Sequence, residues 1–157
     1  MCVAPTPDQL VEAARTLASE AIARGDPPFG ALLVSPHGEV VAMASNRQVS
    51  GDDPTAHAEI ELLRAAARAG HRPPLSAYTM AINAEPCSMC ASALVKAGLG
   101  ALVFGARHEP HMDPDVGSDE VFARSARPPR VLAGVRAEEA RAQIAAARLA
   151  AGTQPLD

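Results

Sequence analysis

The chain has little aromatic surface to offer a partner. Its 157 residues include no tryptophan, one tyrosine (Tyr78) and three phenylalanines. Proteins that bind single-stranded nucleic acids stack bases on aromatic side chains, so this composition disfavours such a surface. The formal net charge of −4 points the same way, because non-specific nucleic-acid binding is mostly electrostatic. We therefore expect the partner to be a small molecule rather than a nucleic acid, with room only for a local basic patch.

Long apolar runs are also missing. No stretch approaches the roughly 20 apolar residues that a helix needs to cross a bilayer. The first residues, Met1 to Pro5, lack the basic start and following apolar segment of a secretory signal. These absences predict a cytoplasmic protein without a membrane segment.

Cysteine is too scarce for a disulfide framework. The chain has three cysteines, which cannot all pair with one another. Two of them, Cys87 and Cys90, are separated by two residues, a spacing that indicates a metal or redox pair. Cys2 is predicted to be a thiol without a specific role.

Helix and strand patterns alternate along the chain. Apolar residues at helical spacing predict helices over 8–24, 55–69, 86–97, 119–124 and 137–150. Short apolar runs predict strands over 29–34, 39–44, 76–83, 101–105 and 131–135. Asp8 and Thr55 are the expected N-terminal caps of the first two helices. With no internal repeat and no linker, the pattern predicts a single layered α/β domain over 1–157.

Two short stretches carry residues that bind metals, and each opens a predicted helix. The first is His57-Ala58-Glu59 and the second runs from Pro86 to Cys90. A catalytic zinc site uses three protein ligands and leaves the fourth position for water, and His57, Cys87 and Cys90 supply that number. The positive end of a helix dipole also lowers the cost of holding a thiolate.

Glu59 is the expected proton shuttle. It lies two residues beyond His57, so in a first helical turn its side chain need not point at the ligand position. A carboxylate beside the activated water can take up its proton and pass it to the ring and then to the departing amine. The alternatives are a helix-capping role for Glu59 and a metal site that is only structural.

The same stretches resemble a known family. The quoted motifs are Pro28-Phe29-Gly30-Ala31, Asn46, the run from Asp53 to Ile60 and the run from Glu85 to Cys90. Their order is the known signature of zinc deaminases. Over residues 8–107 the chain resembles the cytidine and deoxycytidylate deaminase superfamily, and within it the guanine deaminase and tRNA adenosine deaminase branch.

The resemblance implies a three-layer α/β/α cytidine-deaminase-like fold with a five-stranded mixed sheet, a Zn²⁺ cofactor and a homodimer. It also implies that Asn46 hydrogen-bonds the substrate base, that the Ala58 backbone N–H meets a ring carbonyl and that Phe29 walls the pocket. Judged from the residues alone, Asn46 is expected to hold its own loop, and Phe29 is as well suited to the core as to the pocket wall.

The sequence departs from its relatives near the expected substrate. Asn83 stands where relatives carry Thr or Ser, and its amide is a candidate substrate contact. After the last matched strand, Glu109, His111 and Asp113 are further candidates, because ligands tend to bind beyond strand ends in α/β folds. The tail from Ala151 to Asp157 lacks the aromatic residue that guanine deaminases of this type carry.

These observations predict a zinc-dependent hydrolytic deaminase of a small aminated heterocycle. A free purine-type base such as guanine ranks first as substrate. Cytosine-, nucleoside-, pterin- or triazine-like compounds follow, and tRNA adenosine ranks last. The alternative from a different class is a non-catalytic zinc-binding member of the fold.

Overall fold

The computed structural model describes residues 3–108 and 116–152. Five helices are present in the described residues: α1 (Pro7–Arg24), α2 (Ala58–Arg68), α3 (Ser88–Lys96), α4 (Ser118–Ala123) and α5 (Ala137–Ala150). The described strands are β1 (Gly30–Val34), β2 (Val40–Ser45), β3 (Thr79–Ala84), β4 (Ala101–Ala106) and β5 (Arg130–Leu132). Helices and strands alternate as the apolar patterns predict.

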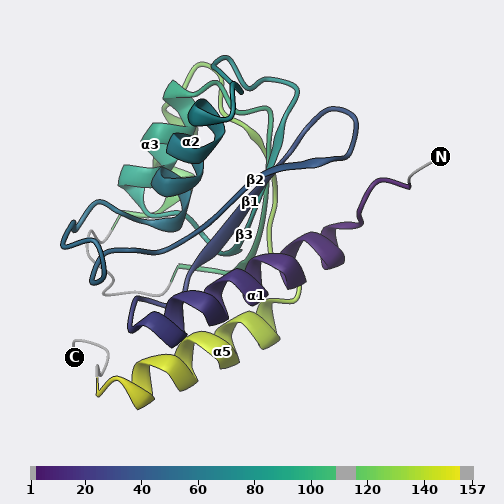
Figure 1. Cartoon of the computed structure of the whole chain (residues 1–157). Coiled ribbons are helices and arrows are strands. Elements are labelled where there is room, and N and C mark those ends of the chain that lie inside the picture. Colours follow the sequence, from purple (N-terminus) through teal and green to yellow (C-terminus); the bar gives the residue numbers. More distant parts are fainter. Residues whose placement is uncertain (1–2, 109–115, 153–157) are drawn as a thin grey trace.

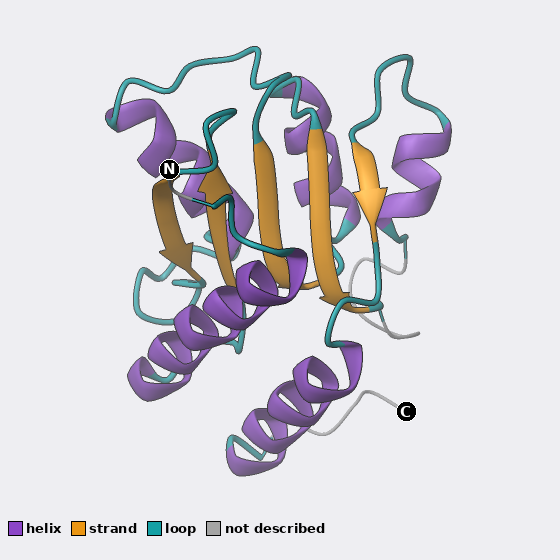
Figure 2. Cartoon of the chain, turned by 90° about the vertical axis from the view of Figure 1, so that its right-hand side faces the viewer, coloured by secondary structure: helices purple, strands orange, loops and turns teal. Residues whose placement is uncertain are grey.

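The strands form one mixed sheet between two helix layers. The strand order is β2-β1-β3-β4-β5; β1 pairs antiparallel with β2 and β3, whereas β3, β4 and β5 run parallel. The α2 and α3 helices cover one face, and α1 and α5 cover the other (Figure 1). Turned by 90°, the molecule shows α1 and α5 lying in front of the strands (Figure 2). The expected three-layer α/β/α fold with a five-stranded mixed sheet is confirmed.

Each helix layer buries an apolar core against the sheet. The larger core lies under α2 and α3 and includes fully buried Leu62, Leu94 and Phe104. A second core packs α1 onto the other face through Val11 and its neighbours. Burying a side chain of this size contributes roughly 1.5–3 kcal/mol, so these two contacts fix the helices on the sheet.

The start of β1 touches α1 directly. A Cβ atom added to Gly30 would lie 2.6 Å from both the Ala18 nitrogen and the Leu17 Cβ. Only glycine therefore fits between strand and helix at this point. This close contact fixes the position of Phe29, the residue before it.

The parallel strands β3 and β4 end side by side, and α3 begins just beyond them. Ala84 pairs with Ala106 at the end of the ladder, and the Glu85 N–H donates to the Ala106 carbonyl at 2.7 Å. Ligands of α/β folds bind at the carboxyl ends of such strands. This edge of the sheet is where the candidate site forms.

Two predicted caps are wrong. The α1 helix is capped by Thr6 in a capping box: the Thr6 hydroxyl oxygen accepts from the Gln9 backbone N–H, and the Gln9 Oε1 atom accepts from the Thr6 backbone N–H. Asp8 therefore lies inside the first turn. Thr55 does not cap α2, because its hydroxyl donates to Asp53 at 2.7 Å and the cap position falls to His57. The metal-binding residue itself therefore ends the loop.

The last strand is shorter than the apolar run predicts. It ends at Leu132, because Gly134 adopts a positive φ of 78° that turns the chain away from the sheet. The Val135 N–H then donates to the Phe104 carbonyl as the chain enters α5. This turn brings α5 onto the face that α1 also covers.

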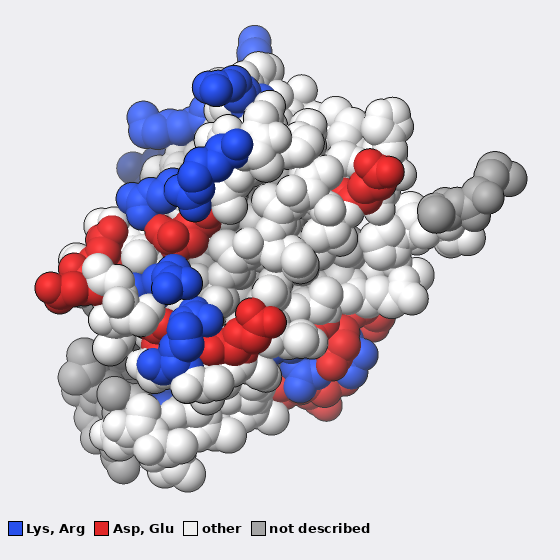
Figure 3. Space-filling model, in the orientation of Figure 1, with Lys and Arg blue, Asp and Glu red and all other residues white. Residues whose placement is uncertain are grey.

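Basic side chains gather on one side of the molecule despite the net negative charge. Figure 3 shows Lys and Arg side chains clustered over α2 and α3. Exposed members on these two helices are Arg64, Arg68 and Lys96. Among the described residues, no helix combines the length and the apolar character needed to cross a lipid bilayer.

Candidate active site

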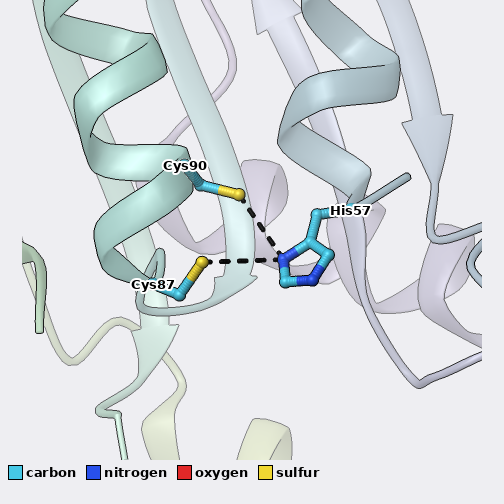
Figure 4. Close-up of side chains that lie close together, drawn as sticks. All are labelled: His57, Cys87 and Cys90. Carbon is cyan, nitrogen blue, oxygen red and sulfur yellow. Dashed lines mark hydrogen bonds between the residues drawn. The ribbon is translucent and has the colours of Figure 1, made fainter. Parts of the chain in front are cut away.

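Two helix starts bring the three predicted metal ligands together. His57 is the cap residue of α2 and Cys87 is the cap residue of α3, with Cys90 in the first turn of α3. Figure 4 shows the two sulfur atoms pointing from α3 toward the imidazole ring at the start of α2. Neither side chain makes a helix-capping hydrogen bond, and both point into the space between the two helix starts.

The distances between these side chains fit a tetrahedral zinc ion. The His57 Nδ1 atom lies 3.5 Å from the Cys90 Sγ atom and 3.7 Å from the Cys87 Sγ atom. With Zn–S bonds of about 2.3 Å and Zn–N bonds of about 2.0–2.1 Å, tetrahedral ligands lie about 3.5–3.6 Å apart. Among the described residues, these three alone form a cluster of possible ligand atoms, all within 4.8 Å of one another. A two-thiolate, one-imidazole set is a donor set that zinc prefers.

The three candidate ligands also shift one another's pKa values. A hydrogen bond from Cys90 lowers the pKa of Cys87 to about 4, with help from His57 and against the effect of burial. The same bond, together with burial, raises the pKa of Cys90. The hydrogen bond with Cys87 raises the pKa of His57, although burial acts against it. Cys87 is therefore the more acidic thiol, and the thiolate is the form that binds metals.

Glu59 lies in the same pocket as the metal ligands. Glu59 is 4% exposed to solvent, and this burial raises the pKa of its carboxyl group to about 7. His57 and Cys87 line the pocket beside it. A carboxyl that titrates near neutrality can both accept and return a proton, which is the property that a proton shuttle needs.

The pocket is built from both helix layers and the strand ends. Its wall comprises Phe29, Asn46, His57, Glu59, Ile82, Ala84, Glu85, Cys87, Ala106, Arg107, His108, Arg141, Ile144 and Arg148. Two of the predicted substrate contacts, Phe29 and Asn46, are among them. Their backbones are joined directly, since the backbone N–H of Asn46 donates to the backbone carbonyl of Phe29 at 2.9 Å.

Asn46 also holds its own loop. Its Oδ1 accepts from the Gln48 N–H at 2.9 Å, and its Nδ2 donates to the Gln48 side chain at 2.7 Å. An Asn amide has two N–H groups and two lone pairs, so one of each is left for a ligand. The loop role and the substrate role are therefore compatible.

Asn83 does not line the pocket. Its Oδ1 accepts from the Gly30 N–H at 3.0 Å, and its Nδ2 donates to the Pro28 carbonyl at 2.9 Å. Strand side chains alternate between faces, and Ile82 on the same strand faces the pocket, so Asn83 points to the α1 side. Asn83 therefore does not face the pocket. Its amide instead binds the backbone of Pro28 and Gly30, the residues on either side of Phe29.

The other predicted substrate contacts are Ala58 in α2 and three residues that follow β4 in the sequence. Ala58 is fully buried in the first turn of α2, where the helix provides no acceptor for its N–H. Glu109, His111 and Asp113 lie outside the described residues. The structure therefore brings together His57, Cys87, Cys90, Glu59, Asn46 and Phe29.

Sequence reasoning missed the contribution of α5. Arg141, Ile144 and Arg148 line the pocket although they are far from the motifs in sequence. Their spacing of three and four residues shows that they share one helix face, but nothing in that spacing indicates what the face meets. Glu85 was also missed as a pocket residue.

Comparison with known proteins supports this site. The family model of the cytidine and deoxycytidylate deaminase zinc-binding region matches residues 5–106. A tRNA-specific adenosine deaminase from Agrobacterium fabrum is 37% identical over 114 residues, which are 73% of this chain and 71% of that protein. A guanine deaminase from Nitrosomonas europaea has a similar structure, with a TM-score of 0.76 at 26% identity, covering 95% of this chain and 87% of that one.

One relative is a much longer protein. A tRNA(Ile)-lysidine synthase from Deinococcus radiodurans is 36% identical over 127 residues, which are 81% of this chain but 22% of that protein. The chain thus spans less than a quarter of that relative's length. The family match, in contrast, contains all three ligands and Glu59. Within the matched region, His57, Cys87 and Cys90 are the residues whose geometry fits a zinc ion, and the chain belongs to the cytidine and deoxycytidylate deaminase family of zinc-binding domains.

Proposed function

We propose that this protein is a zinc-dependent hydrolytic deaminase that releases ammonia from a small aminated heterocycle. The observation that carries the proposal is the burial of the Glu59 carboxyl in the same pocket as three converging zinc ligands. A purely structural zinc site has no use for a buried carboxyl beside it. The described residues also supply three ligands and not four, which leaves a position for water.

The reaction replaces an exocyclic amine with oxygen from water. His57, Cys87 and Cys90 would hold a zinc ion, which would supply Lewis-acid chemistry that brings the pKa of water toward neutrality. Glu59 accepts the proton that water gives up and delivers it to the ring nitrogen. Glu59 then moves the remaining proton of the added hydroxyl group to the amine, so that the C–N bond breaks, ammonia leaves and the oxygen stays on the ring as a carbonyl.

The other pocket residues bind and orient the ring. The free N–H and lone pair of the Asn46 amide hydrogen-bond the heterocycle, and Phe29 packs against it. The Ala58 N–H meets a ring carbonyl. A free purine such as guanine ranks first, which the likeness to the Nitrosomonas europaea guanine deaminase supports. Cytosine-, nucleoside-, pterin- and triazine-like rings remain alternatives.

Ammonia release tests the proposal. Zinc-loaded protein and its Glu59→Ala variant are assayed across purines, pyrimidines, nucleosides, pterins and aminotriazines. We expect release from one compound class, lost in the variant while the bound zinc is kept. No release from any compound by protein that holds one zinc per chain would favour the non-catalytic alternative.

A second candidate is deamination of adenosine in tRNA. It is favoured by the Agrobacterium fabrum relative and by the basic side chains over α2 and α3 (Figure 3). The net charge of −4 and the single lysine, Lys96, weigh against it. Inosine formation in a tRNA anticodon hairpin, measured beside ammonia release from guanine, separates the two substrates.

The domain content and the oligomeric state are also proposals. We infer a single domain over 1–157 and a homodimer. The α3 stretch from Ala91 to Val95 is not the contact as a whole, because Ala91 and Leu94 are buried in the core. Light scattering of purified protein measures the mass in solution, and a monomer at working concentration would contradict the dimer.

A further inference from the structure

Four buried side-chain atoms have no hydrogen-bond partner in the part of the chain that the structure describes. They are Arg15 Nε, Arg136 Nε, Gln143 Oε1 and His108 Nε2. The first three belong to the contact between α1 and α5. His108 alone among them lines the active-site pocket. A buried polar atom without a partner costs desolvation free energy, which a bound ligand atom can offset.

The backbone of His108 is fixed by a residue next to the metal motif. Its N–H donates to the Glu85 Oε2 atom at 2.8 Å, and the Oε1 atom of the same carboxylate accepts from the Ser118 hydroxyl at 2.7 Å. The Glu85 side chain is 5% exposed. Glu85 is followed by Pro86 and the zinc ligand Cys87, so this bond ties His108 to the metal site.

Apolar as well as charged residues share the pocket wall with His108. Ile82, Ala106 and Ile144 line the same pocket from β3, β4 and α5. In small-molecule sites of this kind, a few fixed polar groups among apolar ones set the orientation of the ligand. An imidazole Nε2 atom can donate or accept a hydrogen bond, depending on the tautomer.

We propose that His108 binds the heterocycle through Nε2 and selects rings with an oxo group or ring nitrogen on the bound edge. The inference rests on the deaminase function proposed above and adds a residue that decides specificity. Glu85 acts through His108 as a positioning residue.

The test compares substrate analogues that each lack one polar atom. Guanine, 2-aminopurine (no 6-oxo group), 7-deazaguanine (no N7) and 3-deazaguanine (no N3) are assayed by ammonia release with the wild type and His108→Phe. His71→Phe is the matched control, because His71 is also partly buried but bonds Tyr78 away from the pocket. Circular dichroism and zinc content establish that each variant is folded and loaded, and His108→Ala replaces His108→Phe if the larger side chain prevents folding.

For the wild type we expect one analogue to be poorer than guanine because it lacks the atom that His108 binds. For His108→Phe we expect KM for guanine to rise about 10- to 100-fold with kcat nearly unchanged. The penalty for that one analogue should disappear in His108→Phe and persist in His71→Phe.

Three results overturn the inference. Unchanged KM values in His108→Phe show that Nε2 does not bind the ring. An equal loss on guanine and on every analogue indicates a packing role. A wild type that deaminates no heterocycle overturns the proposed function itself and this inference with it. If a ring other than guanine is the substrate, the same comparison is made with its own single-atom analogues.

Discussion

The buried carboxylate of Asp26 accepts hydrogen bonds from both the backbone N–H and the hydroxyl of Ser50, at 2.8 and 2.7 Å. The Val49 N–H adds a third bond at 3.0 Å. Arg24 donates to Asp26 at 3.1 Å and to the Asn46 carbonyl at 2.9 Å. Residues at the end of α1 thus hold the loop that places Asn46 in the pocket.

Removing the Asp26 charge should destabilise the protein in a pH-dependent way. Burial alone would raise the pKa of Asp26, but the bonds from Ser50, Arg24 and Val49 outweigh it and lower the pKa. A carboxyl whose folded pKa is depressed stabilises the protein above its unfolded pKa of about 3.9, and this stabilisation is lost as the pH falls through the folded pKa. We expect Asp26→Asn to cost about 1–3 kcal/mol of unfolding free energy at pH 7 and progressively less as the pH falls below about 3.9, measured by urea denaturation.

Glu139→Gln is the control for Asp26→Asn. Glu139 pairs with Arg136, but its side chain is 47% exposed, so its removal should cost at most about 1 kcal/mol. Equal costs for the two variants, or a difference that does not change with pH, would show that the Asp26 bonds contribute no special stability.

Glu59→Gln should abolish turnover without loss of metal. The amide keeps the shape of the side chain but cannot shuttle protons, so we expect kcat to fall by about 10²- to 10⁴-fold. Glu61→Gln is the matched control, because Glu61 is on the same helix but outside the pocket wall and pairs with Arg64. Rates are measured by ammonia release, and zinc is counted by elemental analysis. Substantial activity in the zinc-loaded Glu59 variant would remove Glu59 from the reaction.

Cys90→Ala should weaken zinc binding by at least about 100-fold, because it removes one of three protein ligands. Ser88→Ala lies in the same motif but changes no ligand atom, and it should bind zinc as the wild type does. Competition with a chromophoric chelator measures both affinities. If the two variants hold zinc equally well, the assignment of Cys90 as a ligand is wrong.

Asn83→Leu should cost about 2–4 kcal/mol, because it leaves the buried Gly30 N–H and Pro28 carbonyl without partners. Asn83→Thr keeps a hydroxyl of smaller reach and should cost less. Thermal or urea unfolding gives the stability, and KM values for guanine and 2-aminopurine give the selectivity. A change of selectivity at unchanged stability would instead favour direct substrate contact by Asn83.

The sequence predicted that the candidate metal ligands stand at two helix starts, and the structure places them there. His57 and Cys87 each begin a helix, and the helix starts can be placed from nearby residues. The paired motifs in their order also identified the sheet and its layers. The residues that cap the helices were predicted wrongly. Thr55, for example, bonds Asp53 and not the helix that follows it.

The pocket wall was harder to predict because it depends on distant contacts. Strand alternation could have placed Asn83 on the α1 face, given that Ile82 and Ala84 face the pocket. The positions of Arg141 and Arg148 could not be derived, because they follow from how α5 packs after the turn at Gly134. Long-range packing of this kind leaves no signal in local spacing.

The most direct test of the central claim uses isotopically labelled water. Zinc-loaded protein is incubated with guanine in H₂¹⁸O, and ammonia and xanthine are quantified together with the Glu59→Gln variant as control. The account predicts one ammonia for each xanthine, with one ¹⁸O atom in the new carbonyl, and neither product from the variant. If guanine fails, the same measurement is made on the other heterocycles. Absence of ammonia from every one of them, or equal product from the variant, would contradict hydrolytic deamination through Glu59.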